Sequence, residues 1–263
     1  MLVVIKGAGD LASGIALRLH HSKIDVVMTD LPVPLAVRRT VAFSEAIRLG
    51  STEVEDVKAE RAENTDEVRD CLARGVIPVL ADPEAEIIKI LKPEVVVDAI
   101  LAKKNTGTTK NDANMVIGVG PGFTAGKDCH AVIETKRGHT LGRVIRHGSA
   151  IPNTGVPGNV GGQTIRRLLK APADGIFHPE KEIGDLVKEG DRVGNVDGVP
   201  VYALTDGKIR GLLQDGVPVT KGMKSGDVDP RGATVDHLTV SDKATSIGGG
   251  VLEAILSYAG DRL

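Results

Sequence analysis

A repeat of 32 residues in the second half of the chain constrains the fold more than any other feature. The segment Ala171-Pro-Ala-Asp-Gly175 is matched, 32 positions later, by Ala203-Leu-Thr-Asp-Gly207. Four more positions recur at the same spacing: Gly184, Val187, Gly190 and Gly194 are matched by Gly216, Val219, Gly222 and Gly226. Most of these identities are turn-forming residues and the offset has no gap. The pattern therefore predicts two copies of one β-unit over residues 171–226.

The repeat resembles the barrel-sandwich fold of biotinyl and lipoyl domains. Those domains carry a modified lysine on the hairpin between their two halves. In this chain the corresponding hairpin is Asn195-Val-Asp-Gly-Val-Pro200, which contains no lysine. A swinging-arm function is therefore not expected, and the repeat is predicted to be structural or to contact a partner.

The N-terminus has the pattern of a strand, a glycine turn and a helix. Leu2–Ile5 is a continuous apolar run, typical of a strand buried on both faces. The next residues fit G-x-G-x-x-A and open an amphipathic helix, so their backbone is predicted to bind a phosphate-bearing cofactor. The predicted binding residues are Gly7, Ala8, Gly9, Asp10, Leu11 and Ala12. The Asp10 carboxylate would repel a phosphate, so a tight turn that binds nothing stays an alternative.

Acidic residues follow three predicted parallel strands. Val26–Thr29, Val76–Leu80 and Val95–Val97 are apolar runs that end at Asp30, Asp82 and Asp98. Asp30 lies close to the position of the acid that binds a ribose hydroxyl in dinucleotide-binding folds. Ligands of open α/β sheets bind beyond the carboxyl ends of the strands, so Asp30 and Asp98 are predicted to bind the cofactor. Lys103 is predicted to be their cationic partner, with a solvated loop as the alternative.

A glycine-rich stretch, Gly118-Val-Gly-Pro-Gly-Phe-Thr-Ala-Gly126, follows the apolar run Met115–Ile117. Backbone amides in such a loop can form an anion-binding concavity. Gly118, Gly120 and Gly122 are therefore predicted to form one wall of a cofactor site in a cleft between two domains. A hinge between the domains is the alternative interpretation.

These patterns predict an α/β fold in three parts. Residues 1–125 are expected to form a Rossmann-like domain with a parallel sheet. Residues 126–245 are expected to form a β-rich domain that contains the barrel-sandwich repeat. Residues 246–263 read as a C-terminal helix.

Composition excludes several classes of partner. The net charge of −2 gives no electrostatic footprint for nucleic acid. No apolar run reaches the roughly 18 residues of a membrane helix, and two cysteines are too few for a disulfide framework. We therefore expect a cytoplasmic protein without nucleic-acid or membrane partners, and leave a homo-oligomer open. Cys129 and His130 are neighbours on a strand and point to opposite faces, so no metal site is expected.

Eight stretches carry a resemblance that runs nearly end to end. They are residues 6–12, 38–45, 118–126, 134–139, 171–177, 229–231, 241–243 and 247–254. Together they resemble the YqeB family of accessory proteins for selenium-dependent molybdenum hydroxylases. The resemblance implies a role in maturing such a hydroxylase, with the hydroxylase as partner and the handling of its cofactor or its selenium as the task. It implies no catalytic residues; selenium handling would suit a reactive cysteine, for which Cys129 is the candidate.

Three functions follow as competing hypotheses. The first is a maturation factor for a selenium-dependent molybdenum hydroxylase, which handles a nucleotide- or pterin-containing cofactor. The second is an NAD-dependent oxidoreductase, and the third is a non-catalytic scaffold that docks the hydroxylase. The cofactor would accordingly be NAD(P) or of the molybdopterin type. The sequence does not decide whether the chain is an enzyme.

Overall fold

The computed structural model describes residues 1–155 and 158–260, and the chain divides into two compact units. Unit 1 comprises Met1–Pro34, Ala42–Thr154 and Val240–Leu263, and unit 2 comprises Leu35–Val41 and Gly155–Thr239. The sequence placed its boundaries at 125/126 and 245/246. Residues 126–154 and the C-terminal helix instead belong to the unit that contains the N-terminal strand.

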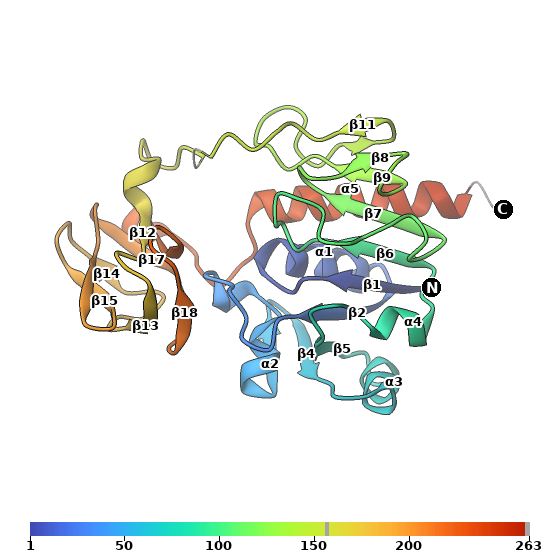
Figure 1. The fold of residues 1–263 in the computed structure, drawn as a ribbon, viewed down its shortest axis with the longest axis horizontal. Helices are drawn as coiled ribbons and strands as arrows, with labels where there is room; N and C mark the ends of the chain where they lie inside the picture. Colours follow the sequence, from blue (N-terminus) through green and yellow to red (C-terminus); the bar gives the residue numbers. More distant parts are fainter. Residues whose placement is uncertain (156–157, 261–263) are drawn as a thin grey trace. The chain divides into compact units, whose positions relative to one another are not determined.

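Unit 1 is built on one nine-stranded sheet (Figure 1). Its strands are β1 (Leu2–Lys6), β2 (Asp25–Asp30), β3 (Ser51–Val54), β4 (Val57–Arg61), β5 (Ile77–Ala81), β6 (Val95–Asp98), β7 (Met115–Val119), β9 (Ala131–Ile133) and β10 (Val144–Ile145). Their order across the sheet is β10-β9-β7-β6-β1-β2-β5-β4-β3. All neighbours from β9 to β4 pair in parallel, whereas β10 and β3 pair antiparallel at the two edges. A small separate pair joins β8 (Thr124–Ala125) to β11 (Gly148–Ser149).

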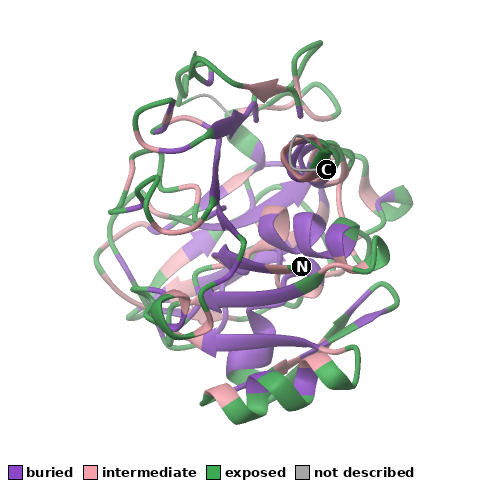
Figure 2. Cartoon of the chain, turned by 90° about the vertical axis from the view of Figure 1, so that its right-hand side faces the viewer, coloured by how far each residue is buried: buried purple, intermediate pink, exposed green. Residues whose placement is uncertain are grey.

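Helices cover both faces of this sheet. The helices of unit 1 are α1 (Asp10–His21), α2 (Glu45–Leu49), α3 (Thr65–Ala73), α4 (Ile87–Leu91) and α5 (Asp242–Gly260). Val68 of α3 and Ile87 of α4 join Val4 and Val27 in one buried cluster, while α1 and α5 pack on the opposite face. Figure 2 shows the result, with buried central strands and exposed outer surfaces on the helices. The continuous apolar runs of the sequence are explained by this burial on two sides.

The glycines of α5 let it pack closely against its neighbours. A Cβ on Gly14 of α1 would lie 2.6 Å from the Cβ of Ala244, and a Cβ on Gly248 would lie 2.7 Å from the carbonyl oxygen of Gly14. On another side of α5, a Cβ on Gly250 would collide with the carbonyl oxygen of Gly142. The glycine run in α5 therefore serves close helix packing, with Gly248 and Gly250 facing two different neighbours. No helix within residues 1–155 and 158–260 is long and apolar enough to span a bilayer.

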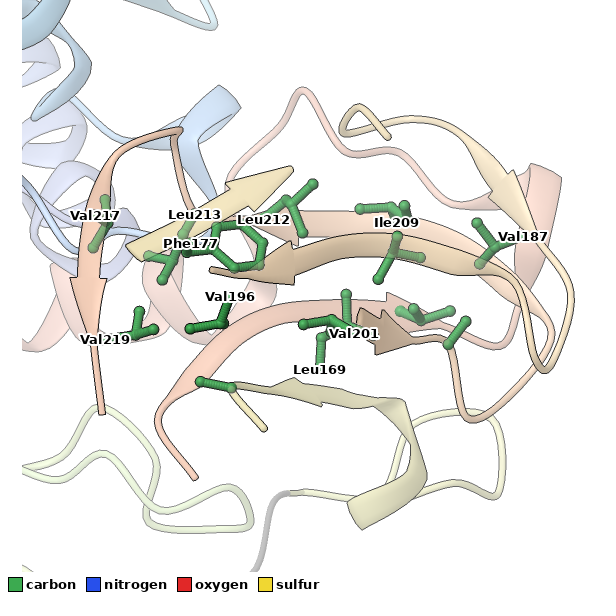
Figure 3. Close-up of a cluster of buried hydrophobic side chains, with 14 residues drawn as sticks. Leu169, Phe177, Val187, Val196, Val201, Ile209, Leu212, Leu213, Val217 and Val219 are labelled. Carbon is green, nitrogen blue, oxygen red and sulfur yellow. The ribbon is translucent and has the colours of Figure 1, made fainter. Parts of the chain in front are cut away.

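Unit 2 consists of two four-stranded antiparallel sheets that enclose one hydrophobic cluster (Figure 3). The first sheet has the order β12-β19-β17-β14 and the second has the order β16-β15-β13-β18. The strands are β12 (Leu168–Lys170), β13 (Gly175–Pro179), β14 (Leu186–Val187), β15 (Arg192–Val196), β16 (Val199–Tyr202), β17 (Gly207–Leu212), β18 (Val217–Val219) and β19 (Lys224–Asp229). Short 3₁₀ turns lie at η1 (Arg39–Val41), η2 (Ile165–Arg167) and η3 (Gly232–Thr234). Shifting by 32 residues carries β13, β14 and β15 onto β17, β18 and β19, so each sheet contains strands from both copies of the repeat.

The predicted fold class is wrong in two respects. The large sheet is mixed rather than purely parallel, because β3 pairs antiparallel with β4 at one edge and β10 pairs antiparallel with β9 at the other. Unit 2 shows two antiparallel sheets, and a biotinyl- or lipoyl-like barrel-sandwich is not shown. The repeat located the turns correctly, but turn positions alone do not determine which strands pair.

Candidate functional site

The carboxyl ends of β2, β1 and β6 meet at one edge of the large sheet. β1 lies between β2 and β6, and Lys6 at its end is in register with Thr29 on one side and Asp98 on the other. The strands that follow β1 in the chain lie first on the β2 side of it, and β6 and later strands lie on its other side. The strand order therefore reverses at β1. Ligands of open α/β sheets bind at such a point. The structure thus places the glycine turn and Asp98 at one edge, with Asp30 at the end of β2 beside them.

Asp30 holds the glycine turn in place. Its Oδ2 accepts a hydrogen bond of 2.7 Å from the Ala8 amide, and its Oδ1 accepts one of 2.7 Å from the Leu31 amide. Burial raises the pKa of this carboxyl above its ordinary value, and the two amide donors oppose that shift. Both oxygens are therefore engaged within the chain. We interpret Asp30 as a residue that positions the turn, while contact with a cofactor stays a prediction.

Space is open beside Gly9, the residue that precedes α1. Gly9 is the N-cap residue with extended backbone and has no side-chain cap, and the helical ladder begins with the Ser13 amide bonded to the Gly9 carbonyl at 2.8 Å. The first-turn amides lie ahead of that ladder and carry the partial positive charge of the helix dipole. A Cβ built on Gly9 would meet no heavy atom within 4 Å. The turn is therefore not tightly packed at Gly9, unlike at Gly7, where a Cβ would lie 2.9 Å from the Ala99 carbonyl oxygen.

The other side of the turn is closed by residues 42–44. The Ala8 carbonyl accepts hydrogen bonds from the Ser44 amide at 2.9 Å and from the Ser13 hydroxyl at 3.2 Å. The Ser13 hydroxyl in turn accepts one of 2.8 Å from the Phe43 amide. These bonds are buried and fix the path of the chain from β1 into α1. The turn is therefore rigid before any ligand arrives.

Asp98 belongs to a buried triad with Lys6 and Thr108. The Lys6 ammonium donates to Thr108 Oγ1 at 2.7 Å, and the Thr108 hydroxyl donates to Asp98 Oδ2 at 2.6 Å. Lys6 Nζ and Asp98 Oδ2 are 4.0 Å apart, so Thr108 bridges the two charges. All three residues are buried. Thr108 is the one buried position between Leu101 and Lys110, so the triad anchors the long β6–β7 connection to the edge of the sheet.

The predicted lysine and the three glycines of the β7 loop have different surroundings. Lys103 is exposed on the β6–β7 connection. A Cβ on Gly122 would lie 2.7 Å from the Cα of Lys104, and one on Gly120 would lie 2.9 Å from Thr135 Oγ1. A Cβ on Gly118 would collide with the ring of Phe123. Each glycine is thus required for close packing, and a direct contact of this loop with a ligand stays a prediction.

Lys243, in the first turn of α5, is a residue that sequence reasoning missed. It is half-buried, and among residues 1–155 and 158–260 the structure gives its ammonium no hydrogen bond or ion pair. Burial lowers its pKa below the ordinary lysine value, and the Arg137 guanidinium lowers it further. The carboxylates of Asp10, Glu134 and Asp242 raise it in part. Its electrostatic neighbours therefore place Lys243 near the start of α1 and the end of β9.

Two of the charged groups that act on Lys243 are themselves held by other contacts. Arg137 donates to both carboxylate oxygens of Asp242, at 2.6 and 3.0 Å, which ties the start of α5 to the loop after β9. Glu134 is buried and accepts three backbone amide hydrogen bonds, from Thr135, Lys136 and Ile151, at 2.7 to 2.9 Å. The Glu134 carboxylate is therefore held by backbone amides rather than by Lys243. In the sequence, Lys243 stood out only as part of the stretch 241–243, one of those that carry the resemblance. Nothing in the sequence indicated that this stretch lies near Gly9.

Cys129 is a poor candidate for a reactive thiol. It is fully buried, and burial raises its pKa to about 11. Because the thiolate is the reactive form, such a cysteine is inert near neutral pH. Within the described ranges, no group of three or more His, Cys, Asp or Glu side chains could hold a metal ion.

Comparisons with known proteins give one clear relative. No family model matches the chain. The chain is 53% identical over 255 residues to "Uncharacterized protein YqeB" of Escherichia coli (strain K12), which covers 97% of this chain and 47% of that protein. The two are homologous over nearly all of this chain, which confirms the YqeB part of the resemblance. The chain spans about half the length of this curated relative.

Three solved structures give only weak similarity. An aspartoacylase family protein from Mesorhizobium loti superposes with a TM-score of 0.30 and 11% identity, covering 86% of this chain and 84% of that one. The ectoine utilization protein EutE from Ruegeria pomeroyi superposes with a TM-score of 0.24 and 12% identity, covering 77% of this chain and 57% of that one. A succinylglutamate desuccinylase/aspartoacylase from Rhodobacter sphaeroides superposes with a TM-score of 0.22 and 24% identity, covering 25% of this chain and 22% of that one. Scores this low carry no argument about the activity of this chain.

The predicted function finds no support in these comparisons and is withdrawn. The relative is uncharacterized, and the solved structures have the titles of aspartoacylase, desuccinylase and ectoine utilization proteins. They give no support to a maturation factor for a selenium-dependent molybdenum hydroxylase with a nucleotide- or pterin-containing cofactor. They support neither an NAD-dependent oxidoreductase nor a docking scaffold. None of these hypotheses is carried further.

Proposed function

We propose that the chain binds a small anionic molecule at the N-terminus of α1, with Lys243 as the counter-charge. The observation that carries the proposal is a half-buried ammonium without a hydrogen-bonding partner in the described part of the chain, beside a helix start that lacks a side-chain cap. Lys243 and Asp10 are electrostatic neighbours, which puts the ammonium near that helix start. A helix N-terminus and a lysine are both groups that attract anions.

The electrostatics of Lys243 favour an anion as ligand. Burial and Arg137 act against its charged form, and the neighbouring carboxylates offset this only in part, because its pKa remains lowered. An anion placed between Lys243 and the first-turn amides would favour the charged ammonium. Binding would therefore satisfy the lysine and the orphan amides of α1 together.

Asp10 restricts which anions fit. It lies in the first turn of α1, and a second negative charge close to its carboxylate would be repelled. A ligand that carries a hydroxyl or another hydrogen-bond donor beside its anionic group would avoid this repulsion. A hydrogen phosphate, a phosphate monoester or a hydroxy acid has this combination.

The surrounding contacts support binding without a large rearrangement. Asp30, Ser13 and Ser44 fix the glycine turn, and Arg137 with Asp242 fixes the start of α5. A preorganised site loses less ordering entropy on binding than a flexible one. The proposal concerns binding, and it assigns no chemical step to these residues.

Titration calorimetry with inorganic phosphate tests the proposal. Lys243→Met should weaken phosphate binding by about tenfold or more, the value of one charged hydrogen-bonding partner. Lys89→Met is the matched control, since it removes the same charge from α4, where Lys89 pairs with Glu86 on the surface. Equal affinities for the two variants would contradict the proposal, as would a wild-type chain that does not bind phosphate.

A further inference from the structure

Exposed apolar residues follow the ends of two strands, at the same edge of the sheet as the proposed anion site. Leu31 and Val33, which follow β2, are 39% and 46% exposed, and Ile100, which follows β6, is 39% exposed. β2 and β6 are the two neighbours of β1, so these apolar residues follow the strands on either side of the strand that leads into the glycine turn. From this placement we infer that the anionic ligand also carries an apolar group. The inference rests on the proposed function.

The carboxylates of Asp30 and Asp98 tie both apolar segments to the backbone near the turn. The Leu31 amide donates to Asp30, whose other oxygen accepts from Ala8 in the turn. The Ile100 amide donates to Asp98 at 3.2 Å, and its nitrogen lies 3.1 Å from where a Cβ on Gly7 would be. The apolar residues are thus attached to fixed backbone on both sides of the turn. Leu31 and Ile100 are therefore exposed although their backbone amides are hydrogen-bonded.

The size of this surface favours a small molecule as its occupant. A stable protein–protein interface buries about 800 Å² on each partner, which three partly exposed side chains do not supply. An apolar surface rimmed by polar groups is typical of a ligand-binding site. Here the turn between the two apolar segments leads into the α1 amides and Asp10, in the same unit. A phosphate or carboxylate joined to a ring or a short aliphatic chain fits this combination.

A pair of ligands that share the anion tests the inference. Phenyl phosphate and inorganic phosphate are titrated into the full chain by calorimetry. Phenyl phosphate should bind about tenfold more tightly, which corresponds to removing part of one aromatic ring from water. In Ile100→Ser the ratio of the two affinities should fall toward one. Ile90→Ser is the matched control, because Ile90 is 63% exposed on α4, ahead of the amino end of β6.

The outcomes separate this inference from the proposed function. Equal affinities of phosphate and phenyl phosphate in the wild-type chain would overturn the inference and leave the anion site intact. A ratio that Ile100→Ser and Leu31→Ser both leave unchanged would also overturn it, because the ring would then bind elsewhere. If Lys243→Met does not weaken either ligand, the proposed function fails and the inference falls with it.

Discussion

Lys6 and Asp98 are paired in register at the ends of β1 and β6, yet their charged atoms are 4.0 Å apart and the Thr108 hydroxyl links them. Thr108 is the acceptor for one charge and the donor to the other. It bonds both the buried Lys6 ammonium and the Oδ2 atom of the buried Asp98 carboxylate. This relationship connects the order of the β6–β7 loop to the stability of the sheet.

Replacing Thr108 by valine should therefore destabilise the chain. The substitution keeps the shape but leaves Lys6 and Asp98 without their bridge, which costs about 2–3 kcal/mol for buried charged groups. Urea unfolding measures the loss as a change in the free energy of unfolding. Thr106→Val, at an exposed position on the same loop, should change it by less than about 0.5 kcal/mol. Similar effects of the two substitutions would show that the bridge contributes little.

Two neighbouring glycines of α5 test the helix packing, because replacing them by alanine should change stability in opposite directions. Gly248→Ala would place a Cβ 2.7 Å from the Gly14 carbonyl oxygen and 2.8 Å from Arg18 Cγ, so the helices must separate and stability should fall. A Cβ on Gly249 meets nothing within 4 Å, so Gly249→Ala should stabilise α5 by up to about 1 kcal/mol through helix propensity. Thermal unfolding of both variants measures the two shifts. A gain in stability for Gly248→Ala would contradict the close packing of α1 and α5.

His130 should make stability depend on pH. Its Nδ1 accepts a hydrogen bond of 3.0 Å from the Val116 amide, and burial, with Lys110, lowers its pKa from 6.5. Because the unfolded chain then binds the proton more readily, this contribution is complete above the unfolded pKa and is lost as pH falls below it. His130→Gln should reduce the loss of unfolding free energy between about pH 7.5 and pH 5.5. An unchanged pH dependence would remove His130 from this role.

Much of the central sheet could be predicted from the sequence, because its strands are buried on both faces. The apolar runs 2–5, 26–29, 95–97 and 115–117 all lie in strands of the structure, and the run 76–80 lies in β5 except for Val76. The edges could not be predicted in this way. β3 is polar at three of its four positions and β4 alternates apolar and polar residues at its start, so neither carries a continuous apolar signal. Their antiparallel pairing is set by tertiary context.

The candidate site was predictable only in part. Gly9 and Asp98 could be proposed from the sequence because they follow strands, which is a local signal. Lys243 lies on the last helix, and it reaches the edge of the sheet because small residues let α5 pack against α1. A contact between residues so distant in sequence has no local signature. The packing function of Gly118, Gly120 and Gly122 was hidden for the same reason, since their neighbours come from other loops.

Anion binding should be coupled to a proton on Lys243. Its pKa is lowered in the free chain, so an anion that favours the ammonium should lose affinity as pH rises toward the ordinary lysine value of 10.5. Phosphate keeps the same charge between about pH 8 and pH 10, so the change would come from the protein. Calorimetry in buffers of different ionisation enthalpy measures the proton uptake. Lys243→Met should abolish the uptake, and an unaltered uptake would assign it to another group.

The location of the anion site is the central claim, and amide chemical-shift mapping tests it most directly. Phosphate is titrated into the isotope-labelled chain while backbone amide resonances are followed. The account predicts that the largest shifts fall on the first-turn amides of α1, from Asp10 to Ala12, and on Lys243, and that they are lost in Lys243→Met but kept in Lys89→Met. Saturable shifts confined to other residues, with these amides unperturbed, would contradict it.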